Sequence, residues 1–80
     1  MMTKNIEALI EDGGEITLGA LPPHECAATA ADGNNCLAML VRHEGESLNV
    51  LLKRLDKAIG LAWSNDMCID EVNGGESDLL

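Results

Sequence analysis

The sequence predicts an α+β domain: a small sheet of three or four strands with a long amphipathic helix packed on one face, in the order α-β-β-β-α-β. Residues 47–64 carry apolar side chains at helical spacing. Two apolar segments flank an Asp-Gly turn before them, and a short apolar segment follows. The chain has 80 residues, which suits one domain. We expect residues 1–72 to form this domain and residues 73–80 to be a flexible acidic tail.

The first helix and strand are predicted from residues 3–21. Residues 3–12 predict a short helix that Thr3 caps and Gly13-Gly14 ends. Its apolar side would consist of Ile6, Leu9 and Ile10. Residues 15–21 alternate apolar and polar side chains, which indicates a strand, and Pro22-Pro23 ends it because proline cannot donate to a sheet ladder.

A β-hairpin is predicted around the turn residues 32–35, with strands at residues 24–31 and 36–43. With this turn Ala31 faces Cys36 and Cys26 faces Val41, so a disulfide between Cys26 and Cys36 is not expected. Residues 36–41 are apolar at both odd and even positions, as in a central strand covered on both faces. The first helix or a second copy, in a homodimer, would supply the second cover.

The long helix is the element with the strongest pattern. Ser47 is expected to cap it and Asn65-Asp66 to end it. Three cations, Lys53, Arg54 and Lys57, are expected on its outer face. Residues 67–72 then predict a last short strand. The apolar stripe is formed by Leu48, Leu51, Leu52, Leu55, Ile59, Ala62 and Trp63.

Two resemblances involve this helix. The run GESLNVLLKRLDKAIGLAW, preceded by a hairpin with an Asp-Gly turn, resembles the hairpin-then-helix half of HicB-like antitoxin domains. The run from Arg42 through RLDKAI to DEVN is similar to small uncharacterised proteins encoded by phages and prophages. The first resemblance implies an antitoxin or regulatory domain that binds a small basic partner. The aromatic residues usual in HicB-like strands are missing here, so that role is the alternative hypothesis.

Residues able to carry chemistry are few. Cys26, Cys36 and Cys68 are an odd number without a CxxC pair, which indicates reduced, buried thiols in a reducing compartment. His24 and Cys26 lie two apart in a strand, and with another cysteine or His43 they could hold zinc or form a thiol–imidazole pair. The spacing requires neither. We therefore expect no enzyme, no catalytic residue, no metal and no cofactor; a deep pocket ringed by His24, Cys26 and acids would overturn this expectation.

Charge is the most informative feature. The chain has 5 Lys and Arg against 14 Asp and Glu, a net charge of −9. Direct nucleic-acid binding is disfavoured, because phosphate backbones require a basic surface and base stacking requires aromatic residues. A basic protein partner is favoured, with simple solubility as the alternative. The expected acidic contacts are Glu7, Glu11, Asp12, Glu15, Asp70 and Glu71.

The sequence contains no apolar stretch of the ~18–20 residues that a membrane span needs. Met1-Met2-Thr3-Lys4 leads into a mixed sequence and not into an apolar run. We expect a cytoplasmic protein. The leading hypothesis is a phage-derived, non-enzymatic inhibitor that occupies a basic, nucleic-acid-binding surface of a host protein.

Overall fold

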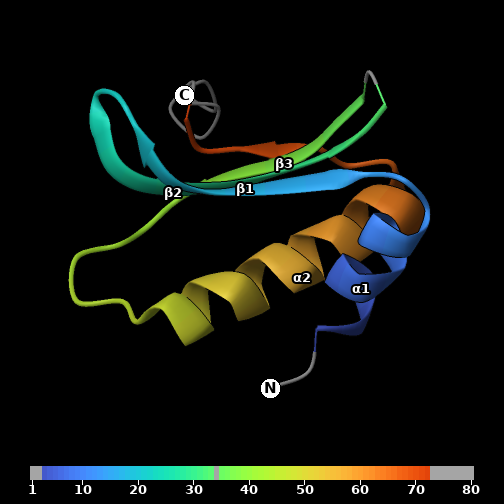
Figure 1. Cartoon of the computed structure of the whole chain (residues 1–80), viewed down its shortest axis with the longest axis horizontal. Helices are drawn as coiled ribbons and strands as arrows, with labels where there is room; N and C mark the ends of the chain where they lie inside the picture. The colour runs from blue at the N-terminus through green and yellow to red at the C-terminus, as the bar shows by residue number, and fades with distance from the viewer. Residues whose placement is uncertain (1–2, 34, 73–80) are drawn as a thin grey trace.

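The computed structural model describes residues 3–33 and 35–72 and has the predicted α+β class, with a four-stranded mixed sheet and two helices (Figure 1). The last strand has two residues where six were predicted, and the predicted acidic tail at 73–80 lies outside the described residues. The elements are α1 (Lys4–Glu11), β1 (Glu15–Leu21), β2 (His24–Asp32), β3 (Asn35–Val41), α2 (Leu48–Asn65) and β4 (Ile69–Asp70).

The sheet has the strand order β1-β2-β3-β4, antiparallel except for the parallel pair β3 and β4. The predicted pairing of Ala31 with Cys36 is confirmed. The predicted pairing of Cys26 with Val41 is wrong, because Val41 pairs with Ala27. The register shifts at a bulge that leaves Leu37 without a partner in β2, and one extra residue moves every later pair by one position.

Both helices lie on the same face of the sheet (Figure 1). The core fills the space between them and the sheet, and it is built from aliphatic side chains and alanine. α1 therefore does not provide the second cover that the apolar run of β3 was expected to have. In the described part of the chain, no element covers the other face of the sheet. The buried core cluster comprises Leu9, Ala28, Ala30, Leu37, Ala38, Leu40, Leu51, Leu55, Ala58 and Ile59.

The two helices begin differently. Ser47 caps α2 as predicted, since its hydroxyl oxygen accepts the Val50 amide at 3.1 Å. Thr3 makes no side-chain cap for α1, contrary to the prediction. The carboxylate of Asp56, on α2, accepts the amides of Asn5 and Ile6 at 2.8 and 2.9 Å instead. The cap of α1 is therefore a tertiary contact that also fastens the two helices together.

Parts of the predicted apolar sides are exposed. Leu48 and Trp63 lie near opposite ends of α2 and are 43% and 44% exposed. Ile10 in α1 is 53% exposed, while Leu9 beside it is fully buried.

Candidate functional site

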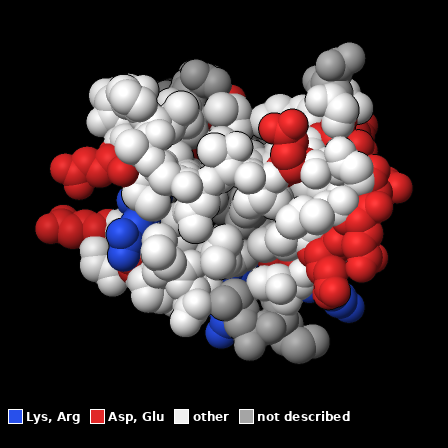
Figure 2. Space-filling view, viewed as in Figure 1, with Lys and Arg blue, Asp and Glu red and all other residues white. Residues whose placement is uncertain are grey.

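Four of the six predicted acidic contacts come together at one end of the molecule. Glu7 and Glu11 lie one turn apart on α1, Asp12 follows directly, and Glu15 begins β1. All four are exposed. Figure 2 shows acidic side chains gathered at this end, over α1 and its connection to β1. We call these four residues the acidic α1 surface.

The acidic α1 surface borders an apolar groove. A hollow of about 570 Å³ runs along α1 and is lined by Ile6 and Ile10 together with Glu7 and Glu11. Ile10 is a large side chain that is more than half exposed there. A protein that docked on this surface would therefore meet carboxylates around an apolar centre, which is the usual layout of a protein interface.

The other two predicted contacts, Asp70 and Glu71, lie at β4 and are half-buried. Contacts within the chain hold the Glu71 carboxylate in place. One carboxylate oxygen accepts the Val41 amide at 2.9 Å, and the other accepts Arg54 Nη1 at 3.2 Å. The structure therefore does not bring Asp70 and Glu71 into the acidic α1 surface, and Glu71 already has two partners within the chain.

Arg54 is the centre of a polar network with Glu46 and Glu71. Its Nε donates to Glu46 at 2.7 Å and its Nη2 donates to the Val41 carbonyl at 2.9 Å. The hydrogen bond from Arg54 lowers the pKa of Glu46 to about 2. The same bond raises the pKa of Arg54. Arg54 is therefore not the free cation on the outer face of α2 that the sequence predicted. Lys53 and Lys57 are exposed.

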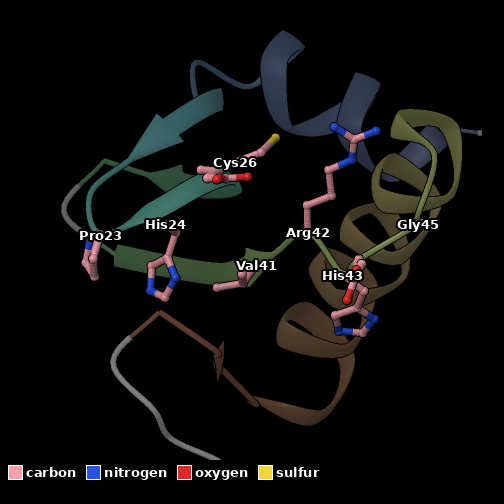
Figure 3. Close-up of a pocket in the computed structure, with 9 residues that line it drawn as sticks. Pro23, His24, Cys26, Val41, Arg42, His43 and Gly45 are labelled. Atoms are coloured by element: carbon pink, nitrogen blue, oxygen red, sulfur yellow. The ribbon is translucent and has the colours of Figure 1, made fainter.

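A hollow of about 790 Å³ lies between the start of β2 and the connection from β3 to α2. It is lined by His24 and Cys26 together with the acids Glu25 and Glu44, which is the set of residues named above as evidence for chemistry, so what they can do depends on the geometry of these groups. In Figure 3 the Cys26 thiol and the His24 ring point away from each other. His24 Nε2 lies 3.5 Å from the Val72 carbonyl oxygen, on the other side of β3. The two groups therefore do not form a nucleophile–base pair in this arrangement. Within residues 3–33 and 35–72, no three His, Cys, Asp or Glu side chains are placed to share a metal ion.

The cysteines are less buried than predicted. Cys26 is half-buried, and Cys36 and Cys68 are exposed. The Cys68 thiol donates to Cys36, with 3.8 Å between the two sulfurs. Partial burial is the first cause, and the Cys68 contact the second, of a Cys36 pKa raised to about 11. This pair was not predicted from the sequence. Cys36 and Cys68 lie at the start of the parallel neighbouring strands β3 and β4, and residues in such positions come to the same end of a sheet.

The helix-free side of the sheet, the open sheet face, carries small, uncharged side chains at its centre, with Glu15 beside Ala31 and Asp70 beside Met39 at its edge strands. A shallow hollow of about 380 Å³ lies on it. Thr17, Thr29 and Met39 lie in line across β1, β2 and β3. Gly19, Ala27 and Ala31 flank this line. The centre of this face is uncharged, and the carboxylates of Glu15 and Asp70 lie on its two edge strands.

Neither helix of the described chain has the length and hydropathy that crossing a membrane requires. Comparison with known proteins gives no further guide: no family model, no curated protein and no solved structure matches this chain.

Proposed function

We propose that this chain is a small, non-enzymatic, phage-derived binding protein that docks its acidic α1 surface onto a basic, nucleic-acid-binding surface of a host protein and inhibits it. The observation that supports the proposal most is the position of the acids on α1. Glu11 and Asp12 lie at the C-terminal end of the helix, where the helix dipole is already negative. The last turn contains no basic residue that would offset them.

Among the described residues, these acids form no ion pair. The ion pairs formed within residues 3–33 and 35–72 are both made by Arg54, and neither includes the acidic α1 surface. Unpaired carboxylates at a helix C-terminus reduce the stability of the helix, so folding does not account for them. A role in attracting a basic partner does explain these carboxylates, because surfaces of opposite charge raise the association rate of two proteins.

The proposed partner presents Lys and Arg side chains that otherwise bind phosphates. Carboxylates on a small rigid scaffold can pair with the same side chains and so exclude the nucleic acid. Exposed Ile10 would add apolar contact at the centre of the interface. Such a complex weakens with increasing salt, because much of its free energy of encounter is electrostatic.

The test compares two charge-neutralised variants that each lose two negative charges. Glu7→Gln/Glu11→Gln changes the acidic α1 surface. Glu25→Gln/Glu44→Gln changes two exposed acids that line the hollow beside His24. Proteins of the source cell are captured on each immobilised variant, and the Kd of each captured partner is measured from 50 to 500 mM salt.

We expect the first variant to bind about ten-fold more weakly or worse, the control to bind nearly as the wild type does, and a nucleic acid to compete with the wild type. Equal losses in both variants would mean that net charge alone attracts the partner. Binding that is insensitive to salt would contradict the proposal directly.

The alternative is a HicB-like antitoxin or regulatory domain. The continuous β2-β3-α2-β4 unit, a hairpin followed by a helix and a strand, favours it. This hypothesis also requires a basic partner, but a small toxin and not a host nucleic-acid-binding protein. Co-purification with a small basic protein whose toxicity the chain suppresses would decide for it.

We further propose that a second copy covers the open sheet face. The centre of this face is uncharged and built from small side chains, so two sheets can approach closely there. The carboxylates of Glu15 and Asp70 at its edges oppose this approach at low salt, where they are least screened. Light scattering should then show a dimer that high salt favours. Thr29→Glu should dissociate it, whereas the same charge added by Ser64→Glu on exposed α2 should not. A monomer at every salt and protein concentration would exclude the dimer.

A further inference from the structure

Cys36 and Cys68 are brought together by the parallel pairing of β3 and β4. Cys36 is the second residue of β3, and Cys68 directly precedes β4. The ladder pairs Ala38 with Ile69, so both cysteines lie at the same end of the two strands. Their sulfurs are 3.8 Å apart and both side chains are exposed. Two accessible thiols in contact are the arrangement that a reversible disulfide requires.

We propose that Cys36 and Cys68 form a redox-active dithiol that closes to an intramolecular disulfide by exchange with a small-molecule disulfide such as oxidised glutathione. An S–S bond is ~2.05 Å long, so the sulfurs have to approach by a further ~1.8 Å. Rotation of the two exposed side chains can supply this movement. The site is independent of the acidic α1 surface and does not depend on the function proposed above.

The exchange proceeds in two balanced steps. The Cys68 sulfur, as thiolate, attacks one sulfur of the external disulfide, forms a mixed disulfide and releases one thiolate. Cys36 then loses its proton to solvent and, as thiolate, attacks the Cys68 sulfur, and the second external thiolate leaves. The two released external thiolates take up from solvent the two protons that the cysteines lost. The chain loses two electrons and two protons overall, and the external disulfide is reduced to two thiols.

The order of these steps follows from the surroundings of Cys36. Partial burial, contact with Cys68 and the negative charge of Asp70 raise the pKa of Cys36 to about 11. Cys36 therefore keeps its proton at neutral pH. The thiolate is the attacking species in exchange, so we assign Cys36 to the second step, in which it resolves the mixed disulfide.

The disulfide would fasten β4 to the rest of the sheet. β4 pairs with β3 through only two residues, Ile69 and Asp70. The bond would close a loop of 33 residues, from 36 to 68 inclusive (68 − 36 + 1). Closing a loop of this length restricts the unfolded chain, so we expect the oxidised form to unfold ~15–30 °C higher than the reduced form.

Trp63 provides a reporter for this reaction. It is the single tryptophan of the chain and lines the same groove, of about 400 Å³, as both cysteines. A disulfide quenches the emission of a nearby indole. Closing of the bond should therefore lower Trp63 fluorescence, and addition of a reduced dithiol should restore it.

The test equilibrates the reduced full-length chain with reduced and oxidised glutathione in varied ratio, and follows intact mass, fluorescence and unfolding temperature. We expect a mass loss of about 2 Da, with peptide mapping that joins residues 36 and 68. Cys26→Ser should behave as the wild type does. Cys36→Ser and Cys68→Ser, once circular dichroism shows that they fold, should lose the 2 Da change and carry a glutathione adduct instead. Only mixed disulfides in the wild type, or a disulfide that includes Cys26, would overturn the proposal.

Discussion

Replacement of Arg54 by alanine should measure how strongly the polar network holds the end of β4. The guanidinium donates to Glu46 at 2.7 and 3.0 Å, to Glu71 at 3.2 Å and to the Val41 carbonyl at 2.9 Å. Arg54 and Glu71 side chains are 27% exposed and that of Glu46 is 6% exposed. The network therefore lies between a surface ion pair, worth ~0–1 kcal/mol, and a buried pair, whose breaking costs ~3–5 kcal/mol. We expect a loss of about 2 kcal/mol, or a Tm lower by ~8–16 °C.

The pH dependence separates this network from simple loss of packing. The pKa of Glu46 is about 2 in the folded chain, below its usual 4.5, first because of the hydrogen bond from Arg54. A lowered folded pKa contributes stability that is present above pH 4.5 and is lost as the pH falls toward 2. The difference between wild type and Arg54→Ala should therefore shrink between pH 7 and pH 3.

Urea unfolding followed by circular dichroism measures this difference at the two pH values. Arg54→Lys is the matched control, because lysine keeps the charge but cannot donate to several acceptors from a planar fork. We expect it to recover only part of the lost stability. A difference of the same size at pH 7 and pH 3 would refute the assignment to Glu46, and so would an alanine variant as stable as the wild type.

Two further substitutions test the packing that positions α1. Asp56→Ala removes the acceptor of the Asn5 and Ile6 amides and should cost ~1–2 kcal/mol in the free energy of unfolding; unchanged stability in urea would mean that water replaces this cap without loss. Gly14→Ala places a Cβ against the Leu9 side chain and 2.8 Å from the Ala31 carbonyl oxygen, which should cost ~1–3 kcal/mol. A neutral result in thermal unfolding would show that the end of α1 can move away.

The sequence contained enough local information to predict the class and most elements. The helical spacing of residues 47–64 placed α2 within one residue at each end. The alternation of residues 15–21 matched β1. These signals are local, because periodicity and turn residues act within a few positions of one another. Ser47 belongs to the same category, since its hydroxyl caps an amide only three residues away.

Features that depend on distant residues were predicted poorly. The cap of α1 comes from Asp56, which is 51 residues from Asn5, and no local pattern indicates it. The bulge at Leu37 moved the hairpin register, and turn chemistry alone does not specify a bulge. The exposure of Trp63 depends on what packs against the end of α2, which the helix sequence does not contain.

The same distinction applies to the candidate site. The acidic α1 surface was predictable, because Glu7, Glu11, Asp12 and Glu15 are near neighbours in sequence. Glu71 was grouped with them by charge alone, although the fold places it against Arg54 on another element. Local composition therefore identifies a charged surface, whereas only the tertiary arrangement tells which charges are already neutralised within the chain.

Side chains hold both ends of β4 in addition to its backbone pairing with β3, and this predicts that the two side-chain contacts compensate for each other. Cys68 precedes the strand and contacts Cys36, while Glu71 follows it and contacts Arg54. If both contacts act by keeping β4 on β3, Arg54→Ala should lower the free energy of unfolding less in the oxidised chain than in the reduced chain, because the disulfide keeps the strand attached. Interactions in separate parts of a protein give additive losses. The test is urea unfolding of Arg54→Ala in the reduced and in the oxidised state, each compared with the wild type in the same state. Equal losses of unfolding free energy would show that the two contacts stabilise different parts of the fold.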